Sequence, residues 1–224
     1  MCGRFAVFTE QEELARLFEV DAIRTEPLPA RYNVAPTLEV YAVVETADRE
    51  RRLGALTWGL VPPWAKEPRP GPINARAETV TEKPAFRDAF VQRRCIIPAD
   101  GFYEWITDPA TGGRLPSFIH REDGHPLAFA GLWSRWRPKG GRDPLNTCTI
   151  MTTEAAPPVA ALHDRMPVML DSDAWDLWLD PGQRDVGRLT ELVAPVVPKG
   201  LTTRRVPTLV NDVRNEGPEL AAPL

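Results

Sequence analysis

The sequence contains no apolar run that is long enough to cross a membrane as a helix. Such a span needs about 18 or more consecutive apolar residues, and charged residues or prolines interrupt every apolar stretch of this chain. The start of the chain also lacks the basic and then apolar pattern of a secretory signal. These absences argue against a membrane protein and lead us to expect a cytoplasmic location.

Cysteine and histidine are scarce, with three of each in the chain. Cys2, Cys95 and Cys148 are odd in number and form no CxxC pair, which argues against a disulfide framework and against a cysteine zinc site. The three histidines make no metal signature with them. We therefore expect neither a metal nor a cofactor.

An excess of positive charge is also missing, because the formal net charge is −4. This value weighs against a general nucleic-acid binder. It leaves room for a local basic groove, since the field in a cleft depends on the charges that line it.

The pattern along the 224 residues is strand-rich, with a few helices and no strict alternation of strand and helix. The 24 prolines are scattered and therefore typical of turns and loops. We expect a single α+β domain over residues 1–224. Its core should be a curled, largely antiparallel, barrel-like β structure with peripheral helices, because closure protects sheet edges.

Local signals place the expected elements along the chain. Thr9 begins a capping-box pattern that predicts a helix, and Ser172 predicts the cap of another. Prolines predict a loop over Pro27–Pro36 and a surface loop that presents Trp64. Further helices are expected at Pro84–Arg94 and Gln183–Leu192, and strands at Leu38–Val44, Leu53–Leu60, Cys95–Pro98, Gly101–Ile106, Leu115–His120, Leu127–Trp133, Asn146–Thr153, Val168–Leu170 and Arg204–Val206.

The first four residues, Met1-Cys2-Gly3-Arg4, carry an unusual chemical possibility. Cysteine is small enough to permit removal of an initiator methionine, and Cys2 would then carry a free α-amine two carbons from its thiol. Such a 1,2-aminothiol condenses with an aldehyde to an imine and then closes to a thiazolidine ring. The alternative is an ordinary cysteine at a frayed end.

Glu104 and His163 are candidate proton-transfer residues. Strand alternation predicts Phe102 and Glu104 on one face, with Tyr103 and Trp105 on the other. A carboxylate beside bulky aromatics is either solvated at a strand end or desolvated with a raised pKa, which suits a proton shuttle. His163 is either a structural loop residue or an acid–base group oriented by its charged neighbours.

Polar side chains alternate at Asn74, Arg76 and Glu78, and in an extended strand all three would face one way. An asparagine offers both a donor and an acceptor, and an arginine fork suits phosphate. A polar edge strand with a local Arg–Glu pair is the alternative. Trp64 could stack on a base, or equally belong to the core or to a protein contact.

Together these segments resemble the SRAP family, named for SOS-response-associated peptidases. The resemblance runs from the first residues to Val210-Asn211 and shows no departure at a functional position. The motifs that carry it are Met1-Cys2-Gly3-Arg4-Phe5, Arg31–Pro36, Trp58–Ala65, Asn74–Glu78, Cys95–Trp105, Met151–Ala155 and His163–Val168.

The resemblance implies a barrel-like α+β core with a DNA groove, and a sensor that bonds abasic sites in single-stranded DNA through Cys2 as a thiazolidine. It implies that Glu104 shuttles protons, that His163 binds the sugar hydroxyl or acts as a second acid–base group, and that Asn74 holds the sugar and amine in register. The implied DNA-binding residues are Arg4, Arg76 and Arg165 for phosphates, Trp64 for base stacking, and Asn33, Pro36 and Thr152 along the groove.

The expected partner is therefore single-stranded DNA with an abasic site, with single-strand to duplex junctions as further candidates. We expect a monomer that associates with the nucleoid on DNA damage, and β-elimination lyase activity is a further expectation. Two other interpretations stay open. Cys2 could be the nucleophile of an N-terminal-cysteine peptidase or amidohydrolase that removes its own Met1. Alternatively, the chain could read modified or single-stranded DNA without a covalent bond.

Overall fold

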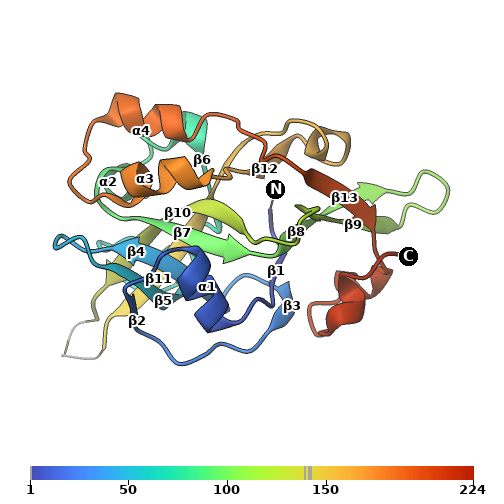
Figure 1. Cartoon of the computed structure of the whole chain (residues 1–224), viewed down its shortest axis with the longest axis horizontal. Helices are drawn as coiled ribbons and strands as arrows, with labels where there is room; N and C mark the ends of the chain where they lie inside the picture. Colours follow the sequence, from blue (N-terminus) through green and yellow to red (C-terminus); the bar gives the residue numbers. More distant parts are fainter. Residues whose placement is uncertain (1, 139, 141–142) are drawn as a thin grey trace.

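The computed structural model describes residues 2–138, 140 and 143–224 (Figure 1). A closed ring of strands forms its centre, in the order β5–β4–β7–β10–β11 and back to β5. Neighbours in this ring are antiparallel except for β11 and β5, whose parallel pairing of Thr147 with Thr57 and Cys148 with Trp58 closes the barrel. The ring strands are β4 (Glu39–Glu45), β5 (Arg51–Trp58), β7 (Arg94–Ala99), β10 (Leu127–Trp136) and β11 (Leu145–Glu154).

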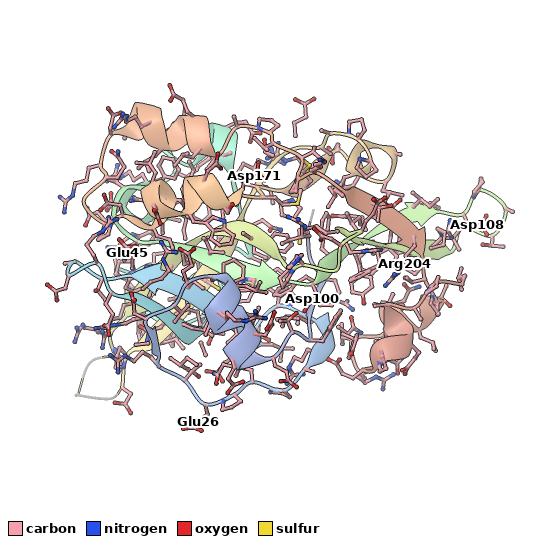
Figure 2. The ribbon with its side chains drawn as sticks, in the orientation of Figure 1. Glu26, Glu45, Asp100, Asp108, Asp171 and Arg204 are labelled. Carbon is pink, nitrogen blue, oxygen red and sulfur yellow. The ribbon has the colours of Figure 1, made fainter. Side chains whose placement is uncertain are left out.

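A second, wholly antiparallel sheet follows the order β13–β9–β8–β1–β3 and leaves the barrel where β7 passes through Asp100 into β8 (Figures 1 and 2). The predicted alternation along β8 is confirmed, because Phe102 packs into the barrel core while Tyr103 belongs to a separate apolar cluster under the second sheet. Its strands are β1 (Phe5–Val7), β3 (Arg31–Val34), β8 (Gly101–Thr107), β9 (Arg114–Arg121) and β13 (Leu201–Arg205).

Short strands extend the edges of β11 and carry predicted site residues. β6 (Asn74–Arg76) runs parallel to β11, with Asn74 opposite Ile150 and Arg76 opposite Thr152. β12 (Arg165–Pro167) pairs antiparallel with the end of the same strand. β2 (Ala22–Ile23) lies at the far edge, parallel to β5. β11 therefore brings β6 and β12 together, because both pair with it at Thr152.

The helices are peripheral, as expected. α2 (Arg87–Gln92), α3 (Trp175–Leu179) and α4 (Val186–Leu192) gather on one side of the barrel, whereas α1 (Gln11–Leu17) lies on another (Figure 1). None of the helices in the described part of the chain is long and apolar enough to cross a bilayer. The short 3₁₀ helices are Ala77–Thr79, Val159–Ala161, Ser172–Ala174, Thr208–Asn211 and Pro218–Leu220.

Both predicted helix caps are wrong. Glu10 is the N-cap of α1, while Thr9 donates from its backbone N–H and its hydroxyl to the Asp100 carboxylate at the sheet junction (Figure 2). Ser172 starts a 3₁₀ turn and makes no side-chain cap, so the α-helix begins only at Trp175. In the first case a carboxylate 91 positions away accepts from the Thr9 hydroxyl, which in a capping box would instead accept from the first turn of the helix.

Three strand predictions also need correction. Arg31–Val34 is strand β3 rather than loop, because it pairs with β1. The expected strand at Val168–Leu170 is reduced to one antiparallel bridge between Met169 and Phe129 of β10, and the preceding residues Arg165–Pro167 form the strand beside β11. β6 ends at Arg76 and Glu78 lies in a 3₁₀ helix, so the polar side chains do not alternate along one strand.

Candidate active site and nucleic-acid interface

Cys2 is held in place from two sides and is fully buried. The Asn74 side-chain amide donates to the Cys2 carbonyl at 2.9 Å. Tyr103 N–H donates to the Arg4 carbonyl at 3.0 Å, which extends the β1–β8 ladder toward the chain start. Burial, and then the negative charge of Glu104, raise the pKa of the Cys2 thiol. The segment is therefore a fixed strand extension, not a frayed end.

Glu104 projects from β8 toward this segment and only 2% of it is exposed. Burial raises the pKa of its carboxyl group, and attraction to His163 offsets part of that rise. The structure thus matches the desolvated alternative for this residue. A carboxyl group with a raised pKa can both donate and accept a proton closer to neutral pH.

His163 follows the 3₁₀ turn Val159–Ala161, and its backbone N–H donates to the Val159 carbonyl at 3.0 Å. Its Nδ1 accepts from the Arg165 N–H at 2.9 Å and also lies 2.7 Å from an Asp164 carboxylate oxygen. One nitrogen cannot accept from one group and donate to another at once, so only one of the two contacts orients the ring. The Asp164 side chain is 85% exposed and can turn to solvent, so we take the backbone contact as the constant one.

Asn74 offers an unused acceptor beside Cys2. Its Nδ2 is engaged with the Cys2 carbonyl, whereas its Oδ1 is buried and has no hydrogen-bond partner among the described residues. A buried amide oxygen without a partner costs free energy. A substrate hydroxyl or amine in this position would supply the missing donor.

Arg165 is not a free cation. Its two terminal nitrogens donate to the Glu78 carboxylate at 2.8 and 2.9 Å, and one also donates to the Thr152 carbonyl at 2.7 Å. Glu78 therefore pairs with Arg165, 87 positions along the chain, rather than with a local arginine as the alternative interpretation expected. Thr152 is fully buried, so its present contact is with Arg165 rather than with solvent.

Arg4 is fixed by Asn33 and by the C-terminal segment. One Arg4 nitrogen donates to Asn33 Oδ1 at 2.6 Å and to the Val210 carbonyl at 2.9 Å. Asn33 is 1% exposed, and its amide donates to the carbonyls of Asp212 and Asn215, both at 2.9 Å. Asn33 therefore ties β3, Arg4 and the end of the chain together.

Six of the predicted residues line two cavities, while Cys2, Asn33, Thr152 and Arg165 line neither. The first, which we call the Glu104 cavity, has a volume of about 420 Å³. The second, the Trp64 cavity, has a volume of about 600 Å³. The Glu104 cavity is lined by Gly3, Arg4, Glu104, Trp105, Arg114, His163 and Asn211. The Trp64 cavity is lined by Trp64, Pro72, Asn74, Arg76, Thr79, Lys83, Pro84, Ala85 and Phe86.

Trp64 and Arg76 are exposed, Trp64 to 65%, as a DNA-facing role requires. Pro36 is half-buried just beyond β3 and lines neither cavity. A larger hollow of about 670 Å³ lies beside Phe18 and Trp175 and contains none of the predicted site residues. No cluster of His, Cys, Asp and Glu suited to a metal occurs among the described residues.

Sequence reasoning missed Arg114 and Asn211 as site residues. For Trp105 it predicted only the face of the strand on which the side chain lies. All three line the Glu104 cavity. Trp105 lies one position after Glu104 inside the same motif, which was the available signal. Arg114 begins β9 after a hairpin turn, and nothing near it in the sequence marks it.

Comparisons with known proteins agree on one family. A family model described as SOS response associated peptidase (SRAP) matches residues 1–213. The abasic site processing protein YoqW of Bacillus subtilis (strain 168) is 42% identical over 224 residues, which cover 98% of each chain. The abasic site processing protein HMCES of Gallus gallus is 34% identical over 200 residues, covering 78% of this chain and 58% of that protein.

Solved structures share the fold. A protein from Bacteroides thetaiotaomicron superposes with a TM-score of 0.84 at 21% identity, with both chains fully covered. Another, from Bordetella bronchiseptica, has a TM-score of 0.75 at 27% identity and covers 92% of this chain and 100% of its own. The expected α+β barrel-like architecture is thereby confirmed.

Proposed function

This chain belongs to the SOS response associated peptidase (SRAP) family, and we propose that it recognises abasic sites in single-stranded DNA and shields them through a covalent bond to Cys2. The observation that carries this proposal is the fixed position of Cys2, which Asn74 holds beside Glu104. The names of relatives that are 34–42% identical, all abasic site processing proteins, support the choice of substrate.

The chemistry requires the α-amine of Cys2, so the Met1–Cys2 peptide bond must first be hydrolysed. Met1 lies outside the described residues. The amine then attacks C1′ of the ring-opened sugar, the resulting hydroxyl leaves as water, and an iminium forms. The thiol sulfur adds to the same carbon and gives up its proton. The product is a thiazolidine, and the condensation releases one water molecule.

Three side chains would assist these steps. Glu104 takes the proton as the sugar ring opens and returns it to the departing hydroxyl, a double role that its raised pKa favours. His163, in the same cavity, serves the sugar hydroxyl or a second proton transfer. The unused Asn74 Oδ1 accepts from the sugar or the amine. Holding the reactants together makes the condensation effectively unimolecular.

The state of the thiol favours this chemistry over a peptidase mechanism. A cysteine nucleophile that attacks an amide must become a thiolate, which needs a lowered pKa. Burial and the Glu104 charge instead raise the pKa of Cys2. In the proposed reaction the amine attacks first and the neutral thiol closes the ring afterwards, so a raised thiol pKa is no obstacle. Lyase activity, in which the amine alone promotes β-elimination, is compatible with the same site.

The DNA contacts follow from exposure and charge. We propose that Arg4, Arg76 and Arg165 bind backbone phosphates and that Trp64 stacks on a base, which favours single strands or junctions over intact duplex. Asn33 and Thr152 are buried against Arg4 and Arg165, so we assign them the positioning of those arginines. Pro36 remains a proposed contact at the edge of the groove.

A denaturing gel tests the proposal. The untagged protein is incubated with a single-stranded oligonucleotide that carries one abasic site, beside the same oligonucleotide without the lesion and one whose abasic aldehyde has been reduced to an alcohol. We expect a shifted band that survives heat and denaturant only with the aldehyde. A protein verified to lack Met1 that forms no such band would refute the proposal.

A further inference from the structure

Two arginine side chains lie close to the Trp105 ring in the Glu104 cavity. The Arg114 guanidinium carbon is 4.9 Å from the centre of the Trp105 ring, and that of Arg4 is 5.9 Å from it. Asn211 fixes this arrangement, because it accepts from Trp105 Nε1 at 2.6 Å and donates to the Arg114 carbonyl at 3.1 Å. A guanidinium over an indole face is held by cation–π attraction.

Neither arginine is held in a salt bridge by the described residues, although the buried Glu104 carboxyl group attracts Arg114 within the same cavity. In the described part of the chain, no salt bridge joins the Arg4 or Arg114 guanidinium to a carboxylate. Asp212 attracts Arg4, but its own carboxylate receives two nitrogens of Arg214, at 2.6 Å in the shorter contact. Arg4 Nε is buried and has no hydrogen-bond partner among the described residues.

The two positive charges also oppose each other. Burial, and then the charge of Arg114, lower the pKa of the Arg4 guanidinium. Two like charges in one cavity are unfavourable unless an anion lies between or beside them. An arginine fork matches the paired oxygens of a phosphate group.

We propose that Arg114 and Arg4 form a clamp, which we call the Trp105 clamp, for one backbone phosphate next to the abasic nucleotide, and that Asn211 positions Arg114 within it. The proposal rests on the proposed function for the identity of the DNA. It adds Arg114 as a DNA-binding residue and gives the Glu104 cavity its own phosphate contact, separate from Arg76 and Arg165.

Equilibrium binding of DNA that cannot react isolates this contact from the chemistry. The probe is a fluorescent single-stranded oligonucleotide with a reduced abasic site, and affinity is measured by anisotropy over a series of salt concentrations. For Arg114→Ala we expect the affinity to fall roughly tenfold. The slope of log K against log salt should become shallower by about 0.7, the value for one phosphate contact on a single strand.

Two variants control for structural effects. Arg114→Lys keeps the charge, so it should retain the salt slope while losing part of the affinity that the fork provides. Arg24→Ala removes the same charge from a surface pair with Glu50 that lines neither cavity, and should change neither quantity. A shallower slope in Arg24→Ala of the same size would show that only net charge matters, and would overturn the proposal.

Neutral linkages locate the phosphate. Oligonucleotides with a single methylphosphonate, placed in turn at each position flanking the abasic site, lack one negative charge at that position. At one position the wild-type protein should lose more affinity than at the others, and Arg114→Ala should lose less there than the wild type does, because only Arg4 still contacts that phosphate. Equal additional losses at every position would refute the clamp. Inorganic phosphate at millimolar concentration should weaken wild-type binding no more than matched ionic strength does; specific competition would assign the site to a free anion instead.

The outcome is separable from that of the proposed function. If Arg114→Ala binds like the wild-type protein while the wild type still crosslinks abasic DNA, the clamp is refuted and the proposed function stands. If the wild type never crosslinks but Arg114→Ala shows the shallower slope, the phosphate contact stands without the covalent chemistry.

Discussion

The Glu104 cavity and the Trp64 cavity differ in chemistry although each contains a residue that contacts the first residues of the chain. The Glu104 cavity is polar and ionisable, with Glu104, His163, Arg4 and Arg114 in its lining. The Trp64 cavity is lined by apolar side chains and prolines, with cationic groups at Arg76 and Lys83 and with Asn74 as its link to Cys2.

In the proposed function this difference separates two tasks. Proton transfer needs a desolvated carboxyl group whose pKa is raised by burial. Base stacking needs an open aromatic face, such as Trp64 at 65% exposure. Changes to Glu104 should therefore act on the rate of crosslinking, and changes to Trp64 on the affinity for DNA.

The largest expected effect comes from Cys2, which supplies both reacting groups in the proposed function. Cys2→Ala keeps the α-amine and removes the sulfur, so the ring cannot close and the heat-stable adduct should be lost. Trapping with borohydride should still capture an imine, because the amine remains. A heat-stable adduct formed by Cys2→Ala without a reductant would contradict the thiazolidine.

Glu104→Gln should slow crosslinking by about 10²- to 10⁴-fold, the range for a general acid–base group. The cause is loss of the proton shuttle, so affinity for the reduced abasic oligonucleotide should be unchanged. Single-turnover kinetics at saturating DNA give the rate, and anisotropy gives the affinity. A large fall in affinity with a normal rate would overturn the role of Glu104.

Trp64→Ala should weaken binding of single-stranded DNA by about 5- to 150-fold, equivalent to ~1–3 kcal/mol for one stacked base. The salt slope should not change, because no phosphate contact is lost. Ile23→Ala serves as the control, because Ile23 is another exposed apolar residue and lines neither cavity. A shallower salt slope in Trp64→Ala would show that the substitution also removes a phosphate contact, and would contradict a pure stacking role for Trp64.

Glu104 should also cost stability at neutral and higher pH. Burial raises its pKa in the folded state, so the folded protein binds the proton more tightly than the unfolded chain does. The resulting stability is present below the unfolded pKa and is lost as the pH rises through the folded value. Thermal unfolding should therefore show Glu104→Gln gaining Tm over the wild type as pH rises. A Tm difference that stays constant across this range would argue against a desolvated Glu104.

The smallest effect is expected at Glu78, whose carboxylate accepts two hydrogen bonds from Arg165 in the DNA-free protein. Glu78→Gln frees the guanidinium for phosphate and should raise DNA affinity about 1.5- to 5-fold, since partly exposed ion pairs are worth ~0.2–1 kcal/mol. Glu82→Gln, an exposed neighbour, removes the same charge as a control. Equal gains in DNA affinity from both variants would show that the change in net charge, and not the release of Arg165, causes the effect.

Candidate site residues that lie inside contiguous motifs could be identified from the sequence. Cys2, Asn74, Glu104 and His163 each lie in a segment that resembles the SRAP family, and the structure brings Asn74 and Glu104 to Cys2. The barrel-like α+β core was also predictable, because strand patterns dominate the chain.

Features that depend on distant partners could not be predicted. The capping box predicted at Thr9 does not form, because the Thr9 N–H and hydroxyl donate to Asp100, which lies far along the chain. The strand at Arg31–Val34 forms only through its pairing with β1. Arg114 is positioned by its contacts with Trp105 and with Asn211, which lies near the C-terminus. Arg204 holds the last segment of the chain by donating to the Ala221 carbonyl at 2.8 Å (Figure 2).

The intact mass of the protein–DNA adduct tests the central claim most directly. The untagged protein is mixed with an oligonucleotide carrying one abasic site, and the product is measured without reduction. We predict the mass of the protein lacking Met1 plus the oligonucleotide minus one water, with no free thiol or amine left on Cys2 in the peptide map. An adduct that retains Met1, or one whose Cys2 thiol still reacts with an alkylating agent, would contradict the account.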